Sequence, residues 1–177
     1  DSITTEDFLA FMDANLRAQN PDAVTDAEIQ EWVYGQGLPA TIRNPQSDAF
    51  DKVAAASARW SNGSITAAEL PTADWSTHEW LHFLNGLPEL TQAQYEELDE
   101  TFALTGTQNA ETAFAWYMQA IKGGYTPAMP ALEEFLMSVG RGKFIYRLYG
   151  ALKDNGQADM ANRVFANAKA GYHPIAQ

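Results

Sequence analysis

Helix boundary signals recur along the whole chain, whereas the alternating pattern of a β-strand is nearly absent. The segment Thr25-Asp26-Ala27-Glu28 has the spacing of a capping box, in which the threonine hydroxyl accepts the third helical amide and the glutamate reaches back to the threonine amide. An apolar series follows and stops at Gly35, a residue type common at helix ends. Comparable patterns predict helices near residues 4–16, 25–35, 47–62, 76–85, 91–102, 109–121, 130–140, 144–152 and 157–170.

These patterns predict an all-α protein. About nine or ten helices joined by short loops favour an antiparallel stack of helix pairs over a four-helix bundle. The sequence has no repeat of fixed period, so a tetratricopeptide-type array has little support. Aromatic residues recur at helical spacing, and we expect them in the core rather than around a cofactor.

The charge of the chain excludes one class of partner and points to one end of the sequence. With 11 basic and 23 acidic side chains the net charge is −12, which would repel the phosphate backbone of a nucleic acid. Residues 141–177 hold six basic and two acidic side chains, a net charge of +4, so residues 1–140 carry −16. A positive region on an acidic body can steer an anionic group to one surface.

The amino-acid composition limits the kinds of protein and of catalysis that remain. The chain has no cysteine, which excludes disulfides and thiol catalysis. It has no apolar run of about 18 residues, so we expect no membrane span and a soluble domain. The sequence does not choose between the cytoplasm and the bacterial periplasm.

Residues His78, Glu79 and His82 form an H-E-x-x-H pattern, which in zinc peptidases places two imidazoles on one helix face with a glutamate that activates water. A third ligand is missing. A glutamate from a second helix would be separated from His82 by roughly 18 to 19 intervening residues, a window that holds Thr101 and Phe102. Glu100 misses this window by about one residue, a rotation of about 100° on a helix. The metzincin extension also fails, because Pro88 stands where its third histidine would be.

A second interpretation explains the same letters without a metal. Ser76 and Glu79 have capping-box spacing, so Glu79 would cap the start of a helix that ends at Asn85 and Gly86. The residues alone leave a small zinc peptidase and a plain helix start as alternatives.

Several segments, in order, resemble one family. They are SITTEDFL at residues 2–9, EWVYGQGLP at 31–39, GRGKF at 140–144 and the tail YHP at 172–174. Together they resemble the C-terminal part of leukotriene-A(4)-hydrolase-type zinc aminopeptidases, in the aminopeptidase N superfamily, and the resemblance covers essentially the whole chain.

The resemblance implies a two-layer α-α superhelix of the armadillo or HEAT kind. It assigns residues 1–20 to a junction helix that follows a catalytic domain, and residues 21–177 to the C-terminal helical domain. The zinc site of the family then belongs to the parent enzyme's catalytic domain, so the pattern at His78, Glu79 and His82 is coincidental. This segment is expected to hold no cofactor and to be inactive alone.

The resemblance also implies a role for Arg141 and Lys143. In the family an arginine and a lysine, two residues apart after a helix end, bind the free carboxylate of a short peptide at the rim of the active-site cleft. The expected partners are therefore the N-terminal and catalytic domains of the same polypeptide and a short peptide substrate. Two alternatives remain: the two cations could neutralise the end of the helix that stops at Gly140, and the chain could be a helical-repeat protein-interaction module.

Overall fold

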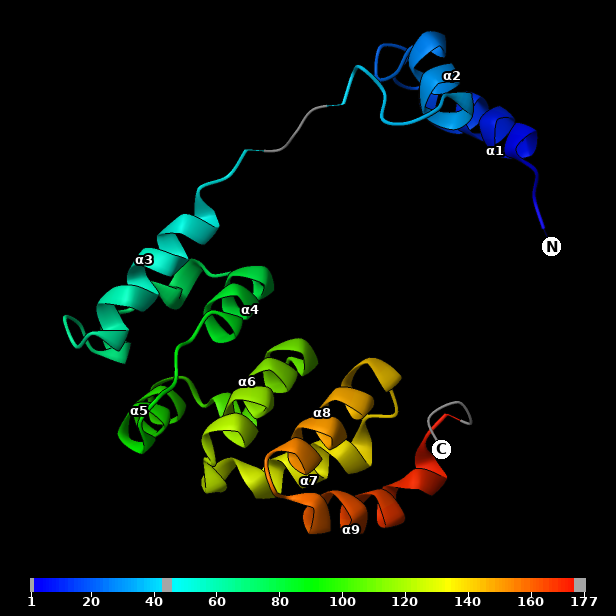
Figure 1. The fold of residues 1–177 in the computed structure, drawn as a ribbon. Helices are drawn as coiled ribbons and strands as arrows, with labels where there is room; N and C mark the ends of the chain where they lie inside the picture. The colour runs from blue at the N-terminus through cyan, green and yellow to red at the C-terminus, as the bar shows by residue number, and fades with distance from the viewer. Residues whose placement is uncertain (1, 43–45, 174–177) are drawn as a thin grey trace. The chain divides into compact units, whose positions relative to one another are not determined.

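The computed structural model describes residues 2–42 and 46–173. The chain divides into two compact units, Asp1–Gln46 and Ser47–Gln177. Nine α-helices, with shorter 3-10 and π turns, make up the regular structure of the described residues, which contain no strand (Figure 1). The all-α prediction is confirmed. The predicted boundary after residue 20 concerns the domains of a larger protein and stays a prediction.

The first unit holds α1 (Thr5–Met12), a π-helical turn (Asp13–Arg17) and α2 (Asp26–Tyr34). The capping box predicted at Thr25 is confirmed, and α1 begins with another at Thr4. Arg17 joins the π-helical turn to α2, because its guanidinium contacts Asp13 at 2.7 Å and Asp26 at 2.6 Å. Among the described residues of this unit, Ile29 is the one large aliphatic or aromatic side chain that is buried.

The second unit carries the main core, and its helices form two layers. Its α-helices are α3 (Ala49–Ser61), α4 (Thr77–Asn85), α5 (Gln92–Phe102), α6 (Ala110–Gly123), α7 (Met129–Ser138), α8 (Gly142–Asp154) and α9 (Ala158–Ala168). One layer follows the neighbours α4, α6 and α8, and the other includes the neighbours α7 and α9. Contacts of α6 with α7 and of α8 with α9 join the layers, and Figure 1 shows this stacked arrangement. The predicted two-layer superhelix is confirmed.

Helix α6 lies at the centre of the second unit, because it touches α4 and α8 in its own layer and α7 in the other. Eight of its residues are buried, including Trp116, which has no exposed surface. A helix covered on several sides has apolar residues around most of its circumference, which explains why its sequence lacks a clear polar face. Asn109 caps its start and Gly124, in the left-handed region at φ 64°, ends it.

None of the helices in the described part of the chain is long and apolar enough to cross a membrane.

Candidate functional site

Arg141 and Lys143 lie together at the start of α8. Arg141 occupies the N-cap position of the helix with an extended backbone, and its side chain makes no capping hydrogen bond. Lys143 belongs to the first turn of the helix. The structure therefore begins this helix two residues earlier than the predicted start at Phe144. Both cations form ion pairs with Glu111 of α6. The last turn of α7 itself contains no basic side chain, and the interpretation that the two cations neutralise the end of that helix stays an alternative.

The loop that carries Arg141 packs against the end of the described chain. The two segments lie close together, since a Cβ atom added to Gly140 would be 3.6 Å from the carbonyl oxygen of Gly171, an ordinary van der Waals contact. The next residue, Tyr172, is buried and its hydroxyl donates to the carbonyl oxygen of Leu136 at 2.6 Å. Because Leu136 lies in α7 just before this loop, the hydroxyl ties the chain end to the helix that leads to Arg141.

Two cations meet one carboxylate at this point. The Lys143 ammonium donates to both carboxylate oxygens of Glu111, each at 2.6 Å. The nearest guanidinium nitrogen of Arg141 lies 3.6 Å from Oε1 of Glu111, which is an ion-pair distance and too long for a good hydrogen bond. The Arg141 side chain is 65% exposed and that of Lys143 is 46% exposed. Arg141 is therefore the more available of the two cations.

Both cations lie next to an aromatic platform, defined as the buried Phe114 and Phe144 and the partly buried Phe135. The ring of Phe144 lies 5.2 Å from that of Phe114 and 5.9 Å from that of Phe135, centroid to centroid. The Arg141 guanidinium carbon lies 5.5 Å and the Lys143 ammonium 5.4 Å from the centroid of Phe144. Both distances are within the range of a cation–π interaction, so the ring of Phe144 contacts both charges.

The start of α8 is electropositive in its backbone as well. Its first turn contains no acidic side chain, and no side chain accepts a hydrogen bond at its cap. The N-terminus of a helix carries a partial positive charge, so two cations there oppose the usual stabilising arrangement. An uncapped helix start with added cations favours binding of an anion over stability of the helix.

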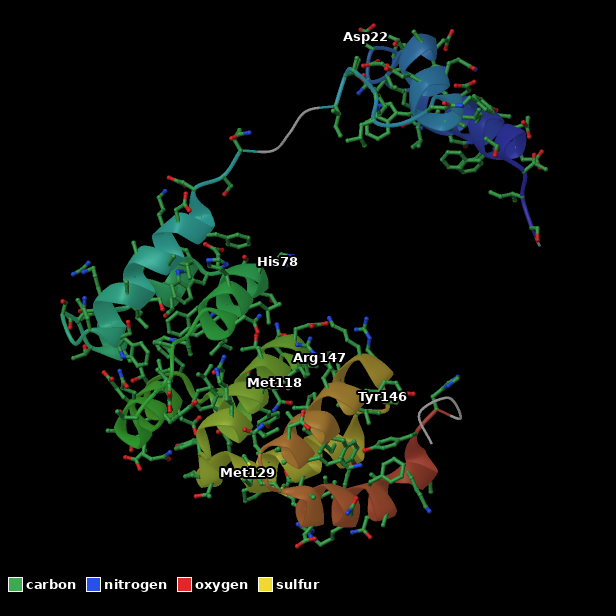
Figure 2. The ribbon with its side chains drawn as sticks, in the orientation of Figure 1. Asp22, His78, Met118, Met129, Tyr146 and Arg147 are labelled. Atoms are coloured by element: carbon green, nitrogen blue, oxygen red, sulfur yellow. The ribbon has the colours of Figure 1, made fainter. Side chains whose placement is uncertain are left out.

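A third cation extends this surface one turn along α8. The guanidinium carbon of Arg147 lies 4.9 Å from the centroid of the Phe114 ring. Arg147 also lines an open groove of about 500 Å³ between α6 and α8, together with Lys122 and Met118. Figure 2 shows Arg147 and Met118 on these neighbouring helices.

The H-E-x-x-H segment has a structural explanation. Ser76 accepts the backbone N–H of Glu79 at 3.4 Å, and the Glu79 carboxylate accepts the Ser76 backbone N–H at 2.9 Å, so the predicted capping box is confirmed. These hydrogen bonds lower the pKa of Glu79 below its ordinary value. The ring of His82 stacks on Phe50 with centroids 4.5 Å apart and planes 7° from parallel.

A glutamate held in a cap is not aimed at a water between two histidines, so these residues do not fit a catalytic zinc. Within residues 2–42 and 46–173, no group of three or more His, Cys, Asp or Glu side chains could hold a metal ion.

Sequence reasoning missed Glu111. It follows the cap Asn109 by two residues, a common place for an acidic side chain at a helix start, and nothing local distinguishes it from other such glutamates. Its contact with Lys143 spans 32 residues and depends on how α6 packs against α8.

The chain is similar to known proteins along most of its length. A family model described as leukotriene A4 hydrolase, C-terminal, matches residues 75–177, which is more than half of the chain. The chain is 27% identical to leucine aminopeptidase 2 of Chaetomium globosum over 174 residues, and 27% identical to aminopeptidase B of Mus musculus over 172 residues. These alignments cover 95% and 90% of this chain but only 28% and 26% of the two relatives. The chain thus spans little more than a quarter of their length.

A solved structure is similar in fold. The structure of native yeast LTA4 hydrolase matches with a TM-score of 0.63 and 20% sequence identity. The match covers 98% of this chain and 31% of that chain.

Proposed function

We propose, from the premise that this chain belongs to the leukotriene A4 hydrolase C-terminal family, that it is the non-catalytic helical domain of a zinc aminopeptidase. The parent enzyme would remove N-terminal residues from short peptides. This domain would form one wall of the substrate cleft, and Arg141 and Lys143 would recognise the C-terminal carboxylate of the peptide. The observation that carries the proposal is the convergence of both cations at the start of α8, which no side chain caps, over the aromatic platform.

The chemistry of the two side chains suits a carboxylate. A guanidinium offers two parallel N–H donors to the two carboxylate oxygens, whereas an ammonium acts as a point charge. Neither side chain is buried, so a peptide end can reach them. Binding the far end of a short peptide positions its scissile bond at the catalytic centre, so part of the binding energy is expressed in turnover.

The first unit supports the proposed partners. Its described part exposes several large apolar side chains, among them Phe11 at 60%, Leu16 at 61% and Trp32 at 55%. A concentration of exposed apolar surface with almost no core of its own is typical of a segment that packs on other protein. We assign that role to the N-terminal and catalytic domains of the same polypeptide, which would also supply the zinc and its ligands.

The test is to replace Arg141 by alanine in the parent enzyme. The kcat/KM for tripeptides should fall at least tenfold, about 1.4 kcal/mol of transition-state stabilisation. The kcat/KM for an aminoacyl anilide should barely change, because that substrate has no carboxylate to bind. A matched control is Arg163→Ala, which removes an arginine that also pairs with a glutamate, Glu133, but lies on α9.

Equal losses on the tripeptide and the anilide would contradict the proposed role of Arg141. The same holds for equal losses in the Arg141 and Arg163 variants, since both would then act through the stability of the domain.

A further inference from the structure

Glu111 contacts Lys143 more closely than it contacts Arg141. Its carboxylate accepts two hydrogen bonds of 2.6 Å from Lys143 and has only a 3.6 Å ion-pair contact with Arg141. The hydrogen-bonding capacity of the lysine is therefore largely directed to Glu111. The guanidinium of Arg141 keeps its donors for another group, and it is also the most exposed of the three side chains.

The position of Glu111 is set by the fold and not by an exposed flexible segment. It lies in the first turn of α6, where its backbone N–H donates to the side chain of the cap Asn109 at 3.1 Å. Its side chain is only 30% exposed. One turn further along α6, Phe114 belongs to the aromatic platform that carries the cations. The backbone of Glu111 is thus held in α6 beside the start of α8, and its carboxylate contacts Lys143 and Arg141 there.

We infer that Glu111 is a built-in counter-ion that makes this site accept a single negative charge, with Arg141 as the direct ligand of the peptide carboxylate. The inference rests on the proposed function of Arg141. Arg141, Lys143 and Glu111 sum to one positive charge, which one carboxylate neutralises. Arg147 lies one turn further along α8, over the ring of Phe114, and is not counted in this sum. Lys143 then serves to neutralise Glu111, which would otherwise pair more closely with Arg141 than the present 3.6 Å and compete with the substrate.

The inference predicts a preference among peptide ends. A C-terminal glutamate brings a second carboxylate into the site, and Glu111 would repel it, whereas a C-terminal glutamine has the same shape without the charge. With the second carboxylate about 7 Å from Glu111 and an effective dielectric constant of about 40, the repulsion changes binding roughly sevenfold. Glu111 would therefore determine specificity without touching the scissile bond.

The experiment compares two tripeptides that differ only in glutamate or glutamine at the C-terminus. In the parent enzyme carrying Glu111→Gln, the ratio of kcat/KM for the glutamate peptide to that for the glutamine peptide should rise about sevenfold over the unmodified enzyme. Glutamine keeps the size of the side chain and one oxygen acceptor, so packing is little changed. A ratio that changes by less than twofold would overturn the inference.

A second set of variants tests the role given to Lys143. In Lys143→Met the carboxylate of Glu111 is left to pair with Arg141, so kcat/KM for the glutamine peptide should fall about tenfold. Adding Glu111→Gln to this variant should restore at least half of that loss on a logarithmic scale, because the competitor is gone. No restoration, or a further loss, would overturn the inference, since Lys143 would then be the direct ligand.

The Arg141→Ala measurement separates the two proposals. A carboxylate-specific loss in that variant together with an unchanged peptide ratio in Glu111→Gln leaves the proposed function standing and removes only the inference. Equal losses on tripeptide and anilide remove both.

Discussion

Replacing Tyr172 by phenylalanine removes one hydroxyl that joins three parts of the second unit. The hydroxyl donates to the carbonyl oxygen of Leu136 in α7 at 2.6 Å and lies 2.8 Å from the hydroxyl of Tyr149 in α8. Since Tyr172 gives its own proton to Leu136, Tyr149 is the donor of the second bond. Tyr172 is 4% exposed and Tyr149 is 9% exposed, so water does not readily replace either partner.

The expected cost follows from the two groups left without their bonds. A buried donor or acceptor without a partner costs about 1 to 3 kcal/mol, and Tyr172→Phe leaves one of each. We therefore expect the free energy of unfolding to fall by about 2 kcal/mol or more, which lowers the melting temperature by roughly 5 to 10 °C for a unit of this size. Urea unfolding followed by circular dichroism measures the change, with an unchanged m-value as the sign of an intact fold.

Two further variants make this reasoning refutable. Tyr149→Phe removes only the donor to Tyr172, which still donates to Leu136, so its cost should be about 1 kcal/mol. The double variant should be no less stable than Tyr172→Phe alone, because it no longer contains the unpaired Tyr149 hydroxyl. If the two single losses simply add, the hydroxyls act independently and the proposed network is wrong.

Three other predictions concern the cap of α4, the histidine His82 and the response to alkaline pH. Ser76→Ala removes the acceptor for the Glu79 amide and should lower the free energy of unfolding by about 1 kcal/mol. His82→Gln should change neither the catalytic activity nor the zinc content of the parent enzyme. Loss of zinc in the His82 variant would support the metal interpretation instead. Burial, with a contribution from Asp99, raises the pKa of Tyr117 and of Tyr125 from 10.0 to about 12. Between pH 10 and 12 the unfolded chain therefore binds fewer protons than the folded chain, so stability is full below pH 10 and falls as the pH rises through this window. Urea midpoints at pH 9 and pH 11 measure the fall, and Tyr117→Phe should reduce it; an equal fall in that variant would assign it to other groups.

Much of the fold could be predicted because its signals are local. The capping boxes at Thr25, Ser76 and Thr91 all begin helices where their four-residue spacing indicates. Such a box depends on hydrogen bonds between residues three apart, so neighbouring sequence decides it without help from the rest of the chain. The same local logic offered a helix start as one of two interpretations of the H-E-x-x-H letters, and the structure confirms the capping box at Ser76.

Other features could not be predicted from local patterns. The π-helical turn Asp13–Arg17 interrupts an apolar series that looks like one continuous helix, and the long-range ion pair between Arg17 and Asp26 has no local signal. The start of α8 at Gly142 was predicted two residues late, because no capping side chain marks it. Sequence rules that locate helix starts by their capping residues cannot locate a start that has none.

By itself, the sequence determined the helices, the order in which they follow one another and the location of a positive region at residues 141–177. Those properties depend on periodicity, capping and charge, all of which are read along the chain. Only the tertiary structure decided that Glu111 lies beside Lys143, that Arg141 keeps the greater exposure, and that Phe144 lies beneath both cations. These contacts arise from the packing of α6 against α8, and packing depends on side-chain shape across helices far apart in the sequence.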